Sequence, residues 1–273
     1  MLIETSGLTV NIEFPSRVKQ DCRYVFFLHG FSGSAADWFD IIPGLDDKFN
    51  YGAVDLPGHG DSGCPVKPEA YSADSIVHTL FESFKEITAD KIILAGYSMG
   101  GRAAMSFAVK HPGFLSGLIL ESSSPGISKA EERAKRVKQD AELISFIENH
   151  TIEEFSDYWM NIDLFKTQKN LSREKLNAVK ELKHRNKKLG LINTLRGFGT
   201  GVMPHLWDSS KYLDVKTLLL CGSLDEKYSN INDTLASLMP DCRLEIIKNA
   251  GHNTHLEKPE VFSDVINAYL KEF

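Results

Sequence analysis

The stretch Gly96-Tyr97-Ser98-Met99-Gly100 constrains the fold of this chain more than any other feature. It follows the apolar run of residues 91–95, which predicts a buried strand, and it precedes a helical pattern in residues 102–110. Glycines at both ends of the motif allow a strand and a helix to approach closely at a sharp bend. The sequence therefore predicts a strand, a strained turn and a helix, with the Ser98 hydroxyl held at the end of a sheet.

Further short apolar runs extend this pattern along the chain. They predict strands in residues 7–14, 22–28, 118–121, 217–222 and 244–247, and one more strand that ends at residues 53–55. The first of these strands is expected to be antiparallel and to lie at the sheet edge. Amphipathic helices are predicted in residues 71–87 and 261–270. Alternating strands and helices predict a mostly parallel sheet covered on both faces, and together with the serine motif they resemble the α/β-hydrolase fold.

The alternation of strands and helices is interrupted once. Residues 126–210 show helical patterns and no convincing strand, and the alternation resumes near residue 216. We therefore expect residues 1–125 and 211–273 to form an α/β-hydrolase core, and residues 126–210 to form a helical cap inserted into it.

A serine hydroxyl becomes a useful base or nucleophile when an imidazole takes its proton and an acid orients that imidazole. In this fold the three residues follow the chain order serine, acid, histidine. Asp225 follows the predicted strand at residues 217–222, and His252 follows the strand at residues 244–247, so we assign them as acid and base. Alternatives for the acid are Glu121, Asp208 and Asp214, and the alternative histidine is His255, which is expected to be a solvent-facing or capping residue.

The predicted strand at residues 22–28 runs into the turn His29-Gly30-Phe31. In hydrolases of this type, backbone amides after such a turn and after the nucleophile form the oxyanion hole. That pattern names the amides of Phe31 and Met99. We expect His29 and His59, both beside glycine turns, to be structural.

Charge and composition exclude several classes of function. The net charge of −6 over 273 residues argues against a nucleic-acid surface. The first residues lack the regions of a signal peptide, and no apolar run has membrane-spanning length, so we expect a cytoplasmic protein without a transmembrane segment. The four cysteines lack metal-ligand spacing, so neither a metal nor a cofactor is expected.

The predicted cap is locally basic. Residues 126–210 contain 15 lysines and arginines against 12 aspartates and glutamates, whereas the rest of the chain has 16 against 25. This pattern suits either an anionic ligand beneath the cap or a set of solvated amphipathic helices. Arginines suited to binding carboxylates are Arg102, Arg133, Arg136 and Arg185, and the neighbouring glutamates also suit a surface role for Arg133.

Taken together, the sequence resembles the 2-succinyl-6-hydroxy-2,4-cyclohexadiene-1-carboxylate synthases of menaquinone biosynthesis over nearly its whole length. The stretches that carry the resemblance are residues 28–33 with Trp38, residues 54–60, 96–102, 121–126 and 130–136, Trp159 with Phe165, and residues 221–225 and 250–255. Most of these are shared with many hydrolases. The Gly-Gly-Arg after the serine motif and the Ala-Glu-Glu-Arg-Ala-Lys-Arg stretch at residues 130–136 are more specific.

The resemblance implies a lyase that removes a ring proton from a cyclohexene with three carboxylates and eliminates pyruvate. It implies that Ser98, Asp225 and His252 are the catalytic residues acting on this small polycarboxylate substrate. It also implies that Arg102, Arg136 and Arg185 bind the carboxylates. The residues implied to line the pocket are Tyr97, Trp159 and Phe165. For Trp159 and Phe165, packing within the cap remains an alternative. A carboxylesterase, a thioesterase, a carbon–carbon bond hydrolase and a non-enzymatic small-molecule receptor also remain open, as does the oligomeric state.

Overall fold

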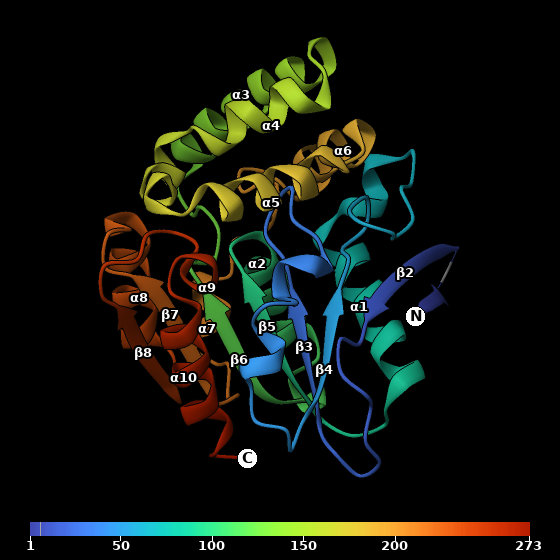
Figure 1. Ribbon diagram of the computed structural model, residues 1–273, viewed down its shortest axis with the longest axis vertical. Coiled ribbons are helices and arrows are strands. Elements are labelled where there is room, and N and C mark those ends of the chain that lie inside the picture. The colour runs from blue at the N-terminus through green and yellow to red at the C-terminus, as the bar shows by residue number, and fades with distance from the viewer. Residues whose placement is uncertain (6) are drawn as a thin grey trace.

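The computed structural model describes residues 1–5 and 7–273, and within these residues eight strands form a single sheet (Figure 1). The strands are β1 (Leu2–Thr5), β2 (Leu8–Glu13), β3 (Tyr24–Leu28), β4 (Asn50–Val54), β5 (Ile92–Tyr97), β6 (Leu115–Glu121), β7 (Thr217–Gly222) and β8 (Cys242–Ile247). Their order is β1-β2-β4-β3-β5-β6-β7-β8. The β1–β2 and β2–β4 pairs are antiparallel and the others are parallel, as expected of a mostly parallel sheet.

Helices connect the strands and cover the sheet. The α-helices are α1 (Ala73–Ile87), α2 (Met99–Lys110), α3 (Ala130–Asn149), α4 (Ile152–Met160), α5 (Arg173–His184), α6 (Lys188–Phe198), α7 (Trp207–Ser210), α8 (Glu226–Leu238), α9 (Thr254–Glu257) and α10 (Pro259–Leu270). Short 3-10 helices are η1 (Ala35–Trp38), η2 (Ile42–Gly44), η3 (Pro68–Tyr71), η4 (Pro112–Phe114) and η5 (Asp163–Asn170). Within the described residues, no helix combines the length and the apolar character needed to cross a membrane.

The sheet is buried on both faces because its strands are apolar on both sides. In β3, Phe26 and Leu28 belong to one apolar cluster and Val25 and Phe27 to another, as the two-residue period of a strand requires. Side chains of α1, α2 and α8 contribute to the first cluster, and side chains of η1 and α10 contribute to the second. The central strands are thereby held rigidly between two layers of helix.

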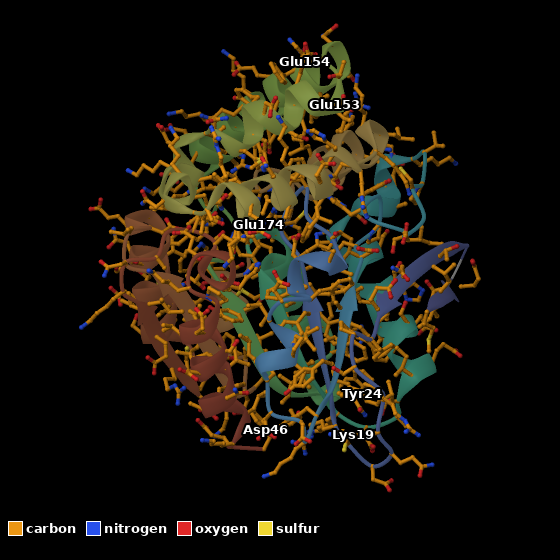
Figure 2. The ribbon with its side chains drawn as sticks, in the orientation of Figure 1. Lys19, Tyr24, Asp46, Glu153, Glu154 and Glu174 are labelled. Carbon is orange, nitrogen blue, oxygen red and sulfur yellow. The ribbon has the colours of Figure 1, made fainter. Side chains whose placement is uncertain are left out.

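Helices α3 to α6 lie over the ends of the strands where β3, β5 and β6 stop (Figure 1). Helices α3, α4 and α6 share an apolar cluster of Ile147, Phe155, Leu191, Ile192 and Leu195, against which Phe31 packs from the loop after β3. Figure 2 shows Glu153 and Glu154 on the outer end of this helical layer, with Lys19 and Asp46 at the opposite end of the molecule.

The division into a core and a cap at residues 125 and 211 stays a prediction. In the structure, the segment between β6 and β7 carries α3 to α7.

The structure differs from the sequence predictions mainly at the N-terminal edge. The strand expected in residues 7–14 is β2, but β1 occupies the edge, so the expected edge position was wrong. β1 has four residues with alternating exposure, which is too short for a clear periodic signal. The helix expected from residue 71 begins at Ala73, because Ser72 caps it by accepting a hydrogen bond from the Ser75 amide.

Candidate active site

Ser98 lies in the tight bend between β5 and α2. Its φ of 51° falls in the left-handed region, a strained conformation for a residue other than glycine. A Cβ atom on Gly96 would collide with the Gly100 carbonyl, and one on Gly100 would collide with the Leu28 carbonyl at the end of β3. The two glycines therefore allow the close approach that the sequence predicts, and the bend places the Ser98 hydroxyl at the carboxyl edge of the sheet.

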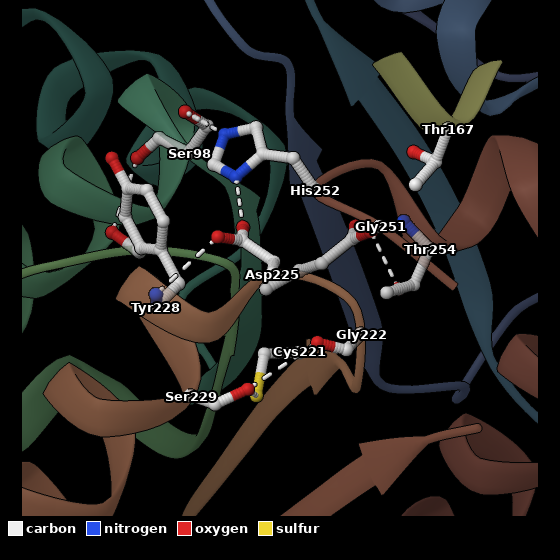
Figure 3. Close-up of polar contacts among 12 residues, drawn as sticks. Ser98, Thr167, Cys221, Gly222, Asp225, Tyr228, Ser229, Gly251, His252 and Thr254 are labelled. Carbon is white, nitrogen blue, oxygen red and sulfur yellow. Dashed lines mark hydrogen bonds and ion pairs between the residues drawn. The ribbon is translucent and has the colours of Figure 1, made fainter. Parts of the chain in front are cut away.

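The structure brings Ser98, Asp225 and His252 together (Figure 3). His252 Nε2 lies 3.0 Å from Ser98 Oγ, and His252 Nδ1 lies 2.6 Å from Asp225 Oδ2. Asp225 caps the N-terminus of α8, and its other carboxylate oxygen accepts a hydrogen bond from the Tyr228 amide at 3.4 Å. Because His252 and Asp225 are buried, the imidazole is held in one orientation toward the serine.

The competing acids and the competing histidine occupy other places. Glu121 ends β6, as predicted, but its carboxylate binds His255 at 2.6 Å. His255 is only 3% exposed and packs against Trp38, with ring centroids 4.3 Å apart and the ring planes tilted by 30°. The expectation that His255 faces solvent was therefore wrong, because it pairs with a carboxylate that is distant in the sequence. Asp208 and Asp214 are exposed.

The backbone amides proposed for the oxyanion hole flank Ser98. Met99 begins α2, and Phe31 follows the Gly30 turn after β3. Within the described part of the chain, the Phe31 amide donates to no protein acceptor, and the Met99 amide donates to none outside α2. Both amides therefore have hydrogen-bonding capacity left for a ligand oxygen.

His29 and His59 lie buried beneath this turn. The Leu56 amide donates to His29 Nε2 at 3.0 Å, and His29 Nδ1 in turn donates to the Gly30 carbonyl at 2.7 Å. Burial lowers the pKa of both imidazoles, and that of His59 falls to about 3. Both rings are therefore neutral parts of the scaffold, in the structural places expected of them.

Two pockets meet at Ser98. One, of about 540 Å³, is lined by Arg102, Arg136 and Tyr228, and the other, of about 130 Å³, is lined by Tyr97, Phe165 and Lys183. Both pockets share Phe31, Ser98, Trp159 and Leu164. A ligand bound over Ser98 can therefore extend in two directions, each toward basic side chains.

Arg102 and Arg136 both line the larger pocket. Arg102 donates to the Phe198 carbonyl at 2.7 Å and stacks over the Phe198 ring, but it makes no ion pair among the described residues. Burial, reinforced by Arg136, lowers the pKa of Arg102 to about 10. The Nε of Arg136 binds Asp140 at 2.7 Å, which orients its guanidinium. Lys227 also lines this pocket. Among the described residues, Arg136 has an ion-pair partner and the neighbouring Arg102 has none, an arrangement suited to an anionic ligand.

The other two predicted arginines do not line either pocket at Ser98. Arg133 lies on α3 and donates to the Val202 carbonyl at 3.2 Å. Arg185 is exposed and lines a separate pocket with Asp55 and Asp61. The structure therefore does not bring these two side chains to Ser98, because the end of α5 turns Arg185 outward.

Lys183 occupies the position that Arg185 was expected to fill. Its Nζ donates to Ser32 Oγ at 3.0 Å, and burial lowers its pKa, although Asp37 opposes the shift. The signal for it lay in helical spacing, since Lys175, Val179, Leu182 and Lys183 follow one face of α5 and all line the smaller pocket.

Aromatic rings surround the imidazole of His252. Phe165 lies 6.0 Å from it between ring centroids, Tyr97 lies 5.4 Å from it, and Trp159 contacts both Phe31 and Phe165. Sequence reasoning missed Tyr228, whose ring lies 4.5 Å from His252 (Figure 3). Its position three residues after Asp225, in the first turn of α8, was the available signal. Water access to the imidazole is therefore restricted on several sides.

Comparison with known proteins gives the family. Residues 24–259 match the family model described as alpha/beta hydrolase fold. The 2-succinyl-6-hydroxy-2,4-cyclohexadiene-1-carboxylate synthase of Enterobacter sp. (strain 638) is 30% identical over 248 residues, which cover 91% of this chain and 92% of that protein. A Bacillus subtilis (strain 168) protein that provisionally carries the same name is 39% identical over 246 residues, 90% of this chain and 89% of that protein.

Solved structures agree with these relatives. The structure of MenH from S. aureus has a TM-score of 0.91 at 31% identity and covers 96% of this chain and 98% of that chain. The enol-lactonase from Burkholderia xenovorans LB400 has a TM-score of 0.82 at 15% identity, covers 99% of this chain and 100% of that chain, and supports the fold alone. The predicted α/β-hydrolase fold is confirmed, and the chain belongs to the 2-succinyl-6-hydroxy-2,4-cyclohexadiene-1-carboxylate synthases, lyases of the α/β-hydrolase superfamily.

Proposed function

We propose that this protein eliminates pyruvate from 2-succinyl-5-enolpyruvyl-6-hydroxy-3-cyclohexene-1-carboxylate, giving 2-succinyl-6-hydroxy-2,4-cyclohexadiene-1-carboxylate for menaquinone biosynthesis. One observation carries the proposal beyond the family relationship. Arg102 is a partly buried cation without an ion-pair partner among the described residues, in a pocket that opens on Ser98. Such a cation favours a ligand carboxylate, because the carboxylate supplies the missing counter-charge.

The chemistry begins at the serine. His252 takes the Ser98 proton, and the resulting alkoxide removes a ring proton beside the succinyl carbonyl. Negative charge then develops on the carbonyl oxygen, where the amides of Phe31 and Met99 donate hydrogen bonds. As the second ring double bond forms, the bond between the ring carbon and the enolpyruvyl oxygen breaks and the enolate of pyruvate leaves. Ser98 keeps the ring proton, the imidazolium of His252 gives its proton to the enolate, and the enol tautomerises to pyruvate. Asp225 holds the imidazole and stabilises its cation, and no water is added to the substrate.

Binding groups on two sides of Ser98 orient the substrate. We assign Arg102 and Arg136 to one carboxylate and Lys183 to another, because these cations line opposite pockets that meet at the serine. Tyr97, Trp159 and Phe165 would pack against the ring and exclude water. Holding both ends of the substrate places the ring proton near Ser98 Oγ, which raises the rate through orientation.

The test is pyruvate release by the purified protein acting on the enolpyruvyl cyclohexene, with the Ser98→Ala variant as control. We expect multiple turnovers from the wild type, loss of most of the rate in the variant, and slower turnover when the abstracted ring position carries deuterium. Acid-quenched enzyme should carry no substrate-derived mass on Ser98. Near-normal pyruvate release by Ser98→Ala would refute the serine-base mechanism.

A serine hydrolase is the second candidate, because the same distances among Ser98, His252 and Asp225 suit acyl transfer. A hydrolase should cleave simple nitrophenyl esters well, whereas a dedicated lyase should be poor at it. An acyl-Ser98 species trapped on the reaction path would favour the hydrolase. Binding of the cyclohexene without turnover would favour a receptor. The cytoplasmic location expected from the sequence stays a prediction that cell fractionation tests.

A further inference from the structure

Glu121 contacts both the nucleophile segment and the base segment of the site. Its backbone carbonyl accepts a hydrogen bond from the Ser98 amide at 2.8 Å. Its carboxylate accepts hydrogen bonds from the amides of Thr254 at 2.7 Å and His255 at 3.1 Å. Thr254 lies two residues after His252 on the same turn (Figure 3). The last residue of β6 therefore joins the strained bend at Ser98 to the turn that carries the imidazole.

The carboxylate of Glu121 is buried and fully engaged. Besides the two amides, the Thr254 hydroxyl donates to it at 2.6 Å, and His255 Nδ1 lies 2.6 Å from its second oxygen. Burial alone would raise the pKa of Glu121, but the charge and hydrogen bond of His255, together with the Thr254 bonds, hold it below its usual value. Glu121 is therefore an anion at neutral pH and can accept from all four donors.

His255 in turn keeps this carboxylate in place. Its ring packs against Trp38 in a tilted arrangement, with centroids 4.3 Å apart, and meets the Tyr97 ring edge-on at 5.0 Å. Tyr97 precedes Ser98 directly, so the imidazole of His255 packs between the nucleophile segment and η1. The pair has few alternative arrangements, because both side chains are almost completely buried.

We propose that Glu121, held by His255, is a positioning residue that sets the alignment of Ser98 with His252. The Ser98–His252 contact depends on two segments that are more than 150 residues apart in the chain, and Glu121 bonds to both. Misplacement of about 1 Å between reacting groups costs up to about 100-fold in rate. This inference deepens the proposed function of the same site, but the alignment it describes does not depend on which substrate is bound.

The test uses the Glu121→Gln variant, which keeps the size of the side chain. One carboxylate oxygen of Glu121 accepts from both amides and the Thr254 hydroxyl, and the other faces His255 Nδ1. An amide has a single acceptor oxygen, so glutamine can replace only one of these two oxygens and disrupts the bonds made by the other. Ser98 reactivity is measured with a fluorophosphonate probe, whose fluoride the serine oxygen displaces. We expect labelling of Ser98 to slow by about 10- to 100-fold, and kcat for pyruvate release to fall similarly. KM should stay within about twofold, since Arg102, Arg136 and Lys183 are untouched.

The matched control is Asp55→Asn, which changes another buried carboxylate that accepts backbone amides, those of Ala35 and Asp61. It bonds to neither Ser98 nor His252, so it should lower the melting temperature without slowing Ser98 labelling in folded protein. If Glu121→Gln does not fold, Thr254→Val removes one hydroxyl bond to Glu121 and should slow labelling by a smaller factor.

The outcomes separate this inference from the proposed function. If wild type labels at Ser98 and Glu121→Gln labels slowly, the positioning role stands even when no pyruvate is released. If Glu121→Gln melts at a lower temperature but labels within twofold of the wild-type rate, the pair is only structural and the inference is overturned.

Discussion

At the scale of single residues, Arg102 has the most direct consequence for substrate binding. Replacing it with alanine removes from the larger pocket a cation that has no ion-pair partner among the described residues. We expect kcat/KM for pyruvate release to fall by the equivalent of about 2–5 kcal/mol. Lysine should restore only part of the loss, because it lacks the planar fork that binds a carboxylate at two points. Steady-state kinetics on variants shown to be folded by circular dichroism measure this, and unchanged kcat/KM in Arg102→Ala would remove the argument for a polyanionic substrate.

Lys183 and Arg185 form a matched pair for a second prediction. They lie two residues apart, but Lys183 lines the smaller pocket at Ser98 and Arg185 is exposed elsewhere. Lys183→Met keeps most of the apolar stem and removes the charge, so KM should rise by about 10-fold or more. Arg185→Ala should leave both kinetic constants within about twofold. The reverse result would return the carboxylate-binding role to Arg185, as the sequence alone suggested.

At the scale of elements, the junction of β5 and α2 depends on the absence of side chains. A Cβ atom on Gly100 would collide with the backbone of Leu28, which cannot move without displacing β3. Gly100→Ala should therefore lower the free energy of unfolding by about 2–3 kcal/mol or more. Gly113→Ala is the control, since a Cβ atom there meets no atom within 4 Å, and its effect should stay within about 0.5 kcal/mol. Urea unfolding measures both variants, and equal stabilities would contradict the packing argument.

Elements with strong periodicity were predictable from the sequence, and short ones were not. β7 was expected in residues 217–222 and occupies Thr217–Gly222, because it is a continuous apolar run buried on both faces. α10 was expected from residue 261 and begins two residues earlier, at Pro259. β1 was not predicted, because a four-residue edge strand is stabilised by its pairing with β2 and not by a local sequence pattern. Local pattern thus predicts an element well where burial is extensive.

At the scale of the whole molecule, buried neutral histidines make stability depend on pH. Burial, with the nearby His29, lowers the pKa of His59 to about 3, from 6.5 for an ordinary imidazole. Between these values the unfolded chain binds a proton that the folded protein does not, so stability falls as pH drops below about 6.5. The slope from one such group is up to about 1.4 kcal/mol per pH unit.

His59→Gln tests this prediction. Urea unfolding at several pH values between 6.5 and 5 should give a flatter pH dependence than the wild type, whatever the variant's absolute stability. His78→Gln, at an exposed histidine of α1, controls for the loss of a histidine as such. An unchanged slope in His59→Gln would mean that His59 takes up its proton in the folded protein.

The sequence by itself determined the serine bend and the chain order of Ser98, Asp225 and His252. These residues follow apolar strands, and parallel strands bring their carboxyl ends to one edge of a sheet, so local pattern was enough. Only the tertiary structure decided that Glu121 pairs with His255, that Lys183 rather than Arg185 lines a pocket at Ser98, and that Tyr228 lies beside His252. Each of these depends on the relative orientation of two packed elements. The spacing of side chains along one element does not specify that orientation.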